Sequence, residues 1–460
     1  MNLNWLVLAL VLLAAAPAAA EVKLPGLISD GMVLQRGRNV RIWGWAGEGE
    51  KVTVKFRGQT LSDTAKDGRW SVSLKPMRAG GPFPMTISGA NTIEFSNVLV
   101  GDVWVCSGQS NMQWPMGWLP DEKDEVESSA NPRIRLFSVP HTQAEQPRDD
   151  IESSWTPCDP QDVVDFSAVG YFFGRDLQKA VKVPIGLIDS SVGGTPAEAW
   201  TRESYLDAAP DLKAIVYEYR ESAQQGSWQS GGLYNGMIAP LLPFPIKGVI
   251  WYQGESNARR PETYETLLPA LIRNWREDWG VGEFAFLIVQ IAPFGKNGKV
   301  SPWSVVREAQ MLTSLRTPRV GLVVTTDIGD RKNIHPLKKE PVGARLALAA
   351  RAIAYGEKLV YSGPIYKSMK VEGDKIALRF NHVGGGLMAV GSVLRGFEIA
   401  GKEGQYVRAD AVIDGDRVIV SSEGVPRPVS VRYGWAQTPQ CNLSNREGLP
   451  ASPFRTDRGG

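Results

Sequence analysis

The sequence predicts an α/β protein in which a parallel sheet, covered by helices on both faces, lies between two β-rich regions. Three observations predict this arrangement: short alternating segments up to residue 100, buried-looking strands that alternate with helical stretches over 101–357, and a return of the alternating pattern over 358–460. Strands that alternate with helices are typical of a parallel sheet. A chain of 460 residues also exceeds what one hydrophobic core usually supports, so two or three domains are expected.

Residues 1–20 are expected to be a signal peptide. An apolar run, Leu6–Ala20, ends in three alanines before Glu21, and small residues at that place suit a signal peptidase. No Lys or Arg precedes the run, which leaves a retained N-terminal anchor as the alternative. The run is short for a membrane span and contains Pro17. We therefore expect cleavage after Ala20 and a periplasmic or secreted protein with no membrane partner.

Residues 21–100 are predicted to form an N-terminal β-domain. Segments such as VRIWGWAGEGE, KVTVKF, WSVSLKP and MTISGANTIEF alternate between apolar and polar residues, and Gly, Asp and Asn turns separate them. This pattern indicates a small β-sandwich. The segments KIALRF, RVIVSS and PVSVRYGW predict a second β-region over 358–460 in the same way.

The middle region, 101–357, is predicted to hold the parallel sheet. Helices are expected at Tyr264–Trp279 and Val342–Tyr355. In open α/β sheets, ligands collect at the carboxyl ends of the strands, so the loops that follow the strands are where chemistry is expected. The strands themselves are predicted at Val103–Cys106, Val183–Ile188, Gly248–Trp251, Phe286–Ile291 and Gly321–Thr325.

Composition excludes several classes of partner. The chain carries 51 Lys and Arg against 49 Asp and Glu, and a net charge of +2 gives no reason to expect nucleic acid as a partner. Three cysteines without a CxxC pair and three widely separated histidines make a metal site improbable. An oxidising compartment would permit one disulfide among Cys106, Cys158 and Cys441. The 15 tryptophans suit either a core or sugar stacking, and the sequence does not indicate an oligomeric state.

The first loop with chemical interest follows the strand VWVC. It reads Ser107-Gly108-Gln109-Ser110-Asn111, and a Ser at such a turn can expose its hydroxyl above the N-terminus of the next helix. The backbone N–H of Ser110 would then be available to a developing oxyanion. The alternative is a Ser or Asn helix cap, which involves no chemistry.

Two more loops carry candidate residues. Gly193 and Gly194 follow a strand and would let the backbone approach a ligand closely, although paired glycines are commonly only a turn. The segment WYQGESNA delivers Gln253, Glu255 and Asn257 into one short loop, where amides and a carboxylate suit oxyanion support and orientation of a base. Glu255 could alternatively cap the helix that follows.

The fourth loop, TTDIGDRKNIHP, contributes His335. Two aspartates, Asp327 and Asp330, precede His335 at the end of a strand. The other histidines are His141, in a loop, and His382, in the trailing β-region. A lone His is more often structural than catalytic, but its place among the other three loops favours His335 as a general base.

Taken together, these segments resemble the sialate O-acetylesterase family of the SGNH-hydrolase superfamily. The resemblance covers most of the mature chain and includes SDGMVLQRG, VWVCSGQSNMQW, SSVGGTPAEAW, LYNGMIAPL, WYQGESNA, DIGDRKNIHP and RYGW with NREGLPASPFRTD. It implies a flavodoxin-like three-layer α/β/α SGNH-hydrolase domain at 101–357, flanked by β-sandwich regions. It also implies that the chain is related to carbohydrate acetyl esterases.

The same resemblance implies roles for individual residues. Ser110 would be the nucleophile, and no cofactor would be required. The oxyanion donors would be the backbone N–H of Ser110, an N–H of Gly193 or Gly194, and a side-chain amide from Gln253 or Asn257. The neighbours of the nucleophile, Gln109 and Asn111, are counted with the residues that bind the oxyanion or substrate.

One position departs from the superfamily pattern. Members of the superfamily typically carry an Asp two or three residues before the catalytic His, and here Asn333 and Lys332 occupy these places. The candidates for orienting His335 are Asp330, Asp327, Glu255 and a backbone carbonyl near Lys332. We favour Glu255, because related esterases with the same QGE loop use that carboxylate.

The predicted function is therefore that of an exported serine esterase acting on an O-acetylated sugar. The substrate could be O-acetylated sialic acid or an acetylated polysaccharide such as xylan, and the sequence favours neither. An alternative of another class is a carbohydrate-binding protein with a decayed esterase site, which the missing Asp before His335 suggests.

Overall fold

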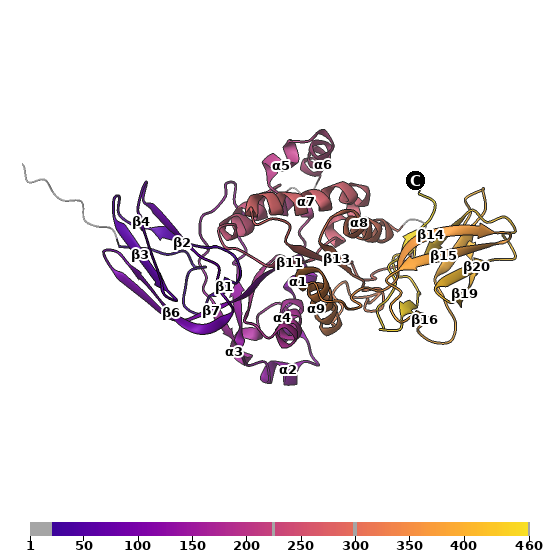
Figure 1. The fold of residues 1–460 in the computed structure, drawn as a ribbon. Helices are drawn as coiled ribbons and strands as arrows, with labels where there is room; N and C mark the ends of the chain where they lie inside the picture. Colours follow the sequence, from indigo (N-terminus) through magenta and orange to yellow (C-terminus); the bar gives the residue numbers. More distant parts are fainter. Residues whose placement is uncertain (1–20, 223–225, 298–300, 459–460) are drawn as a thin grey trace, which may run out of the picture.

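The computed structural model describes residues 21–222, 226–297 and 301–458. The expected signal peptide, residues 1–20, lies outside the described residues. Figure 1 shows three parts in a row: N-terminal strands in indigo, a central part with helices on both sides of a sheet, and C-terminal strands in yellow. Within the described ranges, no helix is long and apolar enough to cross a membrane. Cys106, Cys158 and Cys441 are all free thiols.

The N-terminal part is built from antiparallel strands. Strand β3 pairs with β4 and β6, β6 pairs with β7, and β2 pairs with β5. Exposed and buried residues alternate along β3 and β5, as the period-two pattern predicted. The strands are β1 (Val33–Gln35), β2 (Val40–Trp45), β3 (Lys51–Phe56), β4 (Gln59–Thr64), β5 (Arg69–Leu74), β6 (Gly80–Ser88) and β7 (Thr92–Gly108).

Strand β7 connects the N-terminal and central parts. Its 17 residues begin with alternating exposure and are continuously buried from Val98 onward. The first half pairs with β6, and the second half lies between β10 and β11 in the central sheet. Residue 100, where we expected a domain boundary, therefore lies inside a strand. The change from one buried face to two marks the passage from an antiparallel to a parallel sheet.

The central sheet has the order β13-β12-β11-β7-β10-β8-β9, and all of its strands except β9 run parallel. Five of them (β7, β10, β11, β12 and β13, in chain order) lie in the order 2-1-3-4-5 of doubly wound sheets. The predicted α/β class is confirmed. The remaining strands are β8 (Asn131–Ser138), β9 (Thr156–Cys158), β10 (Ile185–Ser191), β11 (Gly248–Tyr252), β12 (Ala285–Val289) and β13 (Val320–Val323).

Helices cover both faces of this sheet. Helices α4 and α9 lie on one face, and α7 and α8 lie on the other (Figure 1). Two buried apolar clusters, one against each face, hold the layers together. Helix α7 has the predicted bounds, and Gly280 in a left-handed conformation ends it. The helices are α1 (Ser110–Gln113), α2 (Lys123–Glu127), α3 (Pro160–Val163), α4 (Ala168–Val181), α5 (Glu203–Asp207), α6 (Pro210–Arg220), α7 (Tyr264–Trp279), α8 (Pro302–Arg316) and α9 (Glu340–Tyr355).

Single helical turns connect several of these elements. They are η1 (Met116–Trp118), η2 (Ala197–Trp200), η3 (Tyr234–Ile238), η4 (Ala239–Leu241), η5 (Glu255–Arg259) and η6 (Pro261–Thr263). The turn η5 begins with Glu255, and Gln253 and Gly254 separate it from β11. Gly254 is the cap of this turn, so the alternative in which Glu255 caps the following helix is not observed.

The C-terminal part contains two four-stranded antiparallel sheets and a strand pair. The first sheet has the order β14-β15-β20-β19 and the second β18-β17-β21-β23, while β16 pairs with β22. The Tyr366 ring on β14 stacks on Phe454 of β23, with 4.7 Å between centroids, and joins the two sheets. The strands are β14 (Ile365–Glu372), β15 (Lys375–Asn381), β16 (Leu387–Ala389), β17 (Phe397–Ala400), β18 (Val407–Arg408), β19 (Asp410–Asp414), β20 (Arg417–Ser421), β21 (Ser430–Tyr433), β22 (Leu443–Asn445) and β23 (Phe454–Arg455).

Candidate active site

Ser110 lies at the carboxyl end of the central sheet, between β7 and β11. Strand β7 ends at Gly108, whose φ is +133°, and a Cβ there would lie 2.2 Å from the carbonyl oxygen of Tyr252 on β11. Glycine is therefore required where the two strands meet. Gln109 donates its backbone N–H to the same Tyr252 oxygen at 2.9 Å, and Ser110 begins α1. As the first residue of a helix, Ser110 has a backbone N–H without an intrahelical acceptor.

His335 lies against the Ser110 hydroxyl. Its Nε2 is 2.8 Å from Oγ of Ser110. The backbone N–H of His335 donates to Oδ1 of Asn333 at 2.9 Å, which shapes the loop. The imidazole packs on the Trp114 ring, with 4.7 Å between centroids and 30° between planes. The structure thus brings together the two residues that the sequence paired as nucleophile and base.

The surroundings of His335 favour its neutral form. Burial lowers the pKa of the imidazole below its ordinary value of 6.5, and the positive charge of Lys339 lowers it further. A neutral imidazole can accept a proton at Nε2, which a protonated one cannot. At neutral pH, the side chain beside Ser110 is therefore poised as a base.

Glu255 reaches His335 only through Asn111. Its Oε1 accepts a hydrogen bond from Nδ2 of Asn111 at 2.8 Å, and the same Nδ2 donates to the carbonyl oxygen of Ile334 at 3.0 Å. Lys339 donates from Nζ to Oδ1 of Asn111 at 2.6 Å. The direct bond that we expected between Glu255 and His335 is not formed, since the hydrogen bond of Glu255 goes to Asn111, the residue after Ser110. Glu255 holds the loop that carries His335.

This Asn111 network is buried and charged. Glu255 is 7% exposed and Lys339 is 1% exposed. Burial raises the pKa of Glu255 and lowers that of Lys339 to about 7. The opposite charge of each residue partly offsets this effect of burial on the pKa of the other. Oε2 of Glu255 has no hydrogen-bond partner among the described residues.

The two aspartates before His335 serve other partners. Asp330 is exposed, and its Oδ1 accepts from the backbone N–H of Lys332 at 2.7 Å. Asp327 forms an ion pair with Arg345 at 2.6 Å. In the part of the chain that the structure describes, neither aspartate hydrogen-bonds His335, so both shape the loop instead.

Gly193 and Gly194 border Ser110. A Cβ at Gly193 would lie 3.3 Å from Cβ of Ser110. The backbone N–H of Gly193 donates to Oε1 of Gln113 at 2.7 Å. Gly194 has a φ of +74°, which favours glycine. An incoming carbonyl oxygen would compete with Gln113 for the N–H of Gly193.

The amides of Gln253 and Asn257 are already engaged. Both side chains are fully buried. Nε2 of Gln253 donates to Oδ1 of Asn257 at 2.7 Å and to the carbonyl oxygen of Thr195 at 3.1 Å, and Nδ2 of Asn257 donates to Glu198 at 2.9 Å. The Gln253 amide therefore supports the backbone after Gly194, while the Asn257 amide holds the Glu198 side chain. Gln109 is similar, since its Oε1 accepts from the N–H of Gly254 at 3.3 Å.

A cavity of about 330 Å³ opens beside Ser110 and His335. Several of its residues were not singled out from the sequence, because they come from separate loops. Asp189, near the end of β10, could have been predicted from the sequence as a site residue, because it lies at the end of a predicted strand, shortly before Gly193 and Gly194. The other lining residues are Gln113, Trp114, Pro115, Trp118, Ser138, Val139, His141, Asp165 and Ser191.

Asp189 is a half-buried carboxyl group at the edge of this cavity. Burial raises its pKa to about 7, although the Ser191 hydroxyl donates to its Oδ1 at 2.5 Å. His141 approaches Gln113, with 3.4 Å between the two Nε2 atoms. No group of His, Cys, Asp and Glu in the described ranges is arranged to hold a metal ion.

Comparisons with known proteins identify the family of this chain. Residues 100–351, which include Ser110 and His335, match the family model described as carbohydrate esterase, sialic acid-specific acetylesterase. The sialate O-acetylesterase of Pongo abelii is 34% identical over 98% of this chain and 95% of its own length. The human sialate O-acetylesterase is 35% identical over 82% of this chain and 80% of its own length.

A solved structure is also similar over nearly the whole chain. The crystal structure of a carbohydrate acetylesterase from Xanthomonas citri superimposes with a TM-score of 0.90. It is 41% identical in sequence, and the match covers 95% of this chain and all of that one. The likeness therefore extends over the strands on either side of the central sheet.

Proposed function

Because this chain belongs to the carbohydrate esterase family of sialic acid-specific acetylesterases, we propose that it removes O-acetyl groups from carbohydrate through an acetyl-enzyme on Ser110. The family makes the chain a carboxylic ester hydrolase. One observation supports the residues: Nε2 of His335 lies 2.8 Å from Oγ of Ser110, beside a cavity at the carboxyl end of the sheet.

The reaction follows from these positions. His335 takes the proton of the Ser110 hydroxyl as Oγ attacks the acetyl carbonyl carbon. The backbone N–H of Ser110 and the N–H groups of the Gly193-Gly194 turn stabilise the oxyanion. When the intermediate collapses, the bond to the sugar oxygen breaks and His335 returns the proton to that oxygen. Water then repeats the cycle on the acetyl-enzyme.

The orientation of His335 does not depend on a neighbouring carboxylate in this proposal. The Trp114 ring supports the flat face of the imidazole, and Asn111 holds the carbonyl of Ile334 next to it. A Ser–His pair placed in this way matches the dyad form of serine hydrolysis. The intact contact also argues against a decayed esterase site.

Replacement of Ser110 tests the function. We expect Ser110→Ala to lose several powers of ten in acetate release, because a covalent nucleophile is removed. Folding should be retained, since the residue contributes only a hydroxyl at the cavity. Mass spectrometry of the wild-type protein during turnover of p-nitrophenyl acetate should show one added acetyl group on the Ser110 peptide. A variant with even a tenth of wild-type activity would exclude Ser110 as the nucleophile.

We further propose that the protein is exported. The proposal rests on the apolar run before Glu21. Expression with the native leader should yield a periplasmic or secreted product whose N-terminal sequence begins at Glu21. A product that retains residue 1 in a membrane fraction would favour the anchor instead.

A further inference from the structure

The cavity beside Ser110 is lined by acidic residues and by no basic Lys or Arg among the described residues. Two of its lining residues, Asp165 and Asp189, are carboxylic acids, and none of the described residues that line it is Lys or Arg. Lys339 is near but unavailable, because it is 1% exposed and its Nζ donates to Asn111. A negatively charged substrate would therefore find carboxyl groups and no cation at the surface next to Ser110.

A flat apolar surface stands at the same cavity. The Trp118 side chain is 64% exposed, which is unusual for so large an apolar group. Trp114 packs edge-on against it, with 5.1 Å between ring centroids, and reaches His335 on its other side. An exposed indole beside a nucleophile suits stacking against the apolar face of a sugar ring.

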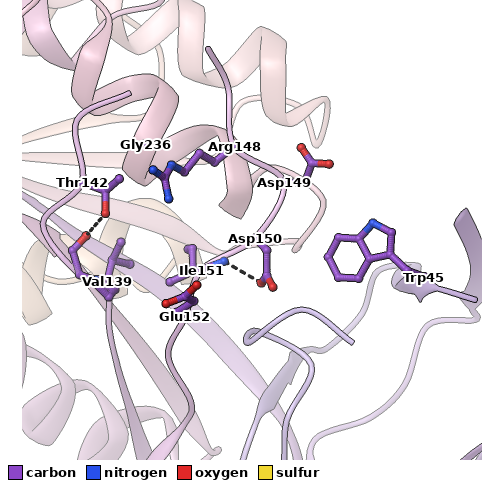
Figure 2. Close-up of a pocket in the computed structure, with 10 residues that line it drawn as sticks. Trp45, Val139, Thr142, Arg148, Asp149, Asp150, Ile151, Glu152 and Gly236 are labelled. Carbon is purple, nitrogen blue, oxygen red and sulfur yellow. Dashed lines mark hydrogen bonds between the residues drawn. The ribbon is translucent and has the colours of Figure 1, made fainter. Parts of the chain in front are cut away.

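A second, larger hollow of about 550 Å³ adjoins the first and shares Val139 with it. Figure 2 shows its charged side chains: Asp149, Asp150 and Glu152 surround it, with Arg148 as the single cation among the residues drawn. Arg69 pairs with Asp149 from outside. A longer substrate that extended past Val139 would again meet more carboxylates than cations.

From these observations we propose that the acetylated sugar is uncharged. The cavity takes a neutral O-acetylated sugar that stacks on Trp118 and bonds Asp165 and Asp189 through its hydroxyls, and it disfavours a sugar carboxylate such as that of sialic acid. This inference rests on the proposed function of Ser110. A sugar carboxylate near Asp189 would be repelled in a partly buried site, where charges are poorly screened. Because burial raises the pKa of Asp189 to about 7, the repulsion is strongest above pH 7, where this carboxyl group is ionised, and the substrates are best compared there.

The test compares three esters by acetate release: an acetylated xylo-oligosaccharide, 9-O-acetyl sialic acid, and the methyl ester of that same sialic acid. The methyl ester keeps the shape of the sugar and removes its charge. We expect kcat/KM to be highest for the neutral oligosaccharide, and about tenfold or more higher for the methyl ester than for the free acid. A free acid that reacts as fast as its methyl ester would overturn the inference.

Variants of the cavity test the cause. Asp165→Asn and Asp189→Asn should each raise the ratio of free acid to methyl ester toward one, whatever they do to absolute rates. Asp374→Asn, exposed in the turn between β14 and β15, should leave the ratio unchanged. Trp118→Ala should raise KM for the oligosaccharide more than for p-nitrophenyl acetate. An Arg148→Ala variant that selectively raises KM for the free acid would reveal a carboxylate site and overturn the inference.

The two proposals fail in different ways. A wild-type protein that releases acetate from none of the three esters and does not cleave p-nitrophenyl acetate would overturn the proposed function, and the inference with it. A wild-type protein that is active but prefers the charged sugar would overturn the inference alone.

Discussion

Ser110 and His335 are 225 positions apart in the chain, yet their side chains lie 2.8 Å from one another. The environment of His335 determines the protonation state of this pair. Burial and the charge of Lys339 both disfavour the imidazolium form, so the residue is a free base over a wider pH range than an exposed histidine.

A pH profile follows from this environment. Activity requires neutral His335, so kcat/KM for p-nitrophenyl acetate should rise with pH as the imidazole loses its proton. Because the pKa is lowered, the midpoint of this rise should lie below 6.5. Lys339→Met should move the midpoint upward, even where it lowers the plateau, because it removes a positive neighbour. A wild-type midpoint at or above 6.5 would contradict the role of burial.

Glu255 acts on His335 through an amide. Gln can still accept the hydrogen bond from Asn111, so we expect Glu255→Gln to lose only a few-fold in kcat. Glu255→Ala frees Asn111 and the loop that it holds, and a displaced base can cost about 100-fold. Asp330→Asn, at an exposed position, should be nearly silent. If Glu255→Gln is as damaging as Glu255→Ala, the charge itself is required and Glu255 is a true acid partner.

At the scale of elements, β7 has two roles in one strand. Its first half belongs to the N-terminal sheet, and its last residue, Gly108, delivers Ser110 to the edge of the central sheet. The strand also stands where the order of the sheet reverses, between β10 and β11. Loops diverge at such a point and leave room for a ligand.

Gly108 is therefore a sensitive position in the strand. In Gly108→Ala, the new methyl group would overlap the Tyr252 carbonyl, which lies 2.2 Å away, and β7 would have to separate from β11. We expect urea denaturation to show a loss well above the 1–2 kcal/mol that a strained backbone alone costs, together with a large fall in activity. Gly37→Ala is a matched control, because its φ is +69° but nothing lies within 4 Å of the added carbon. Equal losses in the two variants would exclude crowding as the cause.

At the scale of the whole molecule, Arg307 fastens the C-terminal part to the central one. This fully buried side chain of α8 donates to the carbonyl oxygens of Ile291, Ala436 and Gln437 at 2.9, 2.9 and 3.1 Å. Burial lowers its pKa to about 10, so it stays charged at neutral pH. The neighbouring Glu308 adds an ion pair with Arg455 of β23 at 3.0 Å.

Removal of this guanidinium should loosen the C-terminal part. Arg307→Met removes the donor to all three carbonyl groups and leaves that of the buried Ile291 without it, so we expect a loss of about 3 kcal/mol in the free energy of unfolding. Limited proteolysis should then cleave between α9 and β14 before the rest of the chain. Arg417→Met, which removes a surface ion pair with Asp414, should change stability by less than about 0.5 kcal/mol. If the two variants are cleaved at similar rates, Arg307 does not hold the C-terminal part to the central part.

Much of the fold and part of the candidate site could be predicted from the sequence. The five buried runs of the middle region correspond to β7, β10, β11, β12 and β13, and the predicted helix at Tyr264–Trp279 has the bounds of α7. These elements are readable because periodicity and turn residues are properties of neighbouring positions. The loops that carry Ser110 and His335 were readable for a related reason, since strand ends in a parallel sheet gather at one edge.

The tertiary structure decided what each side chain touches. The sequence placed Glu255 near His335, but whether the carboxylate meets the imidazole or Asn111 depends on packing between loops that are more than 70 residues apart in the chain. The same holds for Asp165, Asp189 and Trp118, which share a cavity only because three separate segments converge there. The local sequence pattern determines which helices and strands form. Contacts between side chains from distant segments depend on how those helices and strands pack, and a shift of one residue gives a side chain a different hydrogen-bond partner.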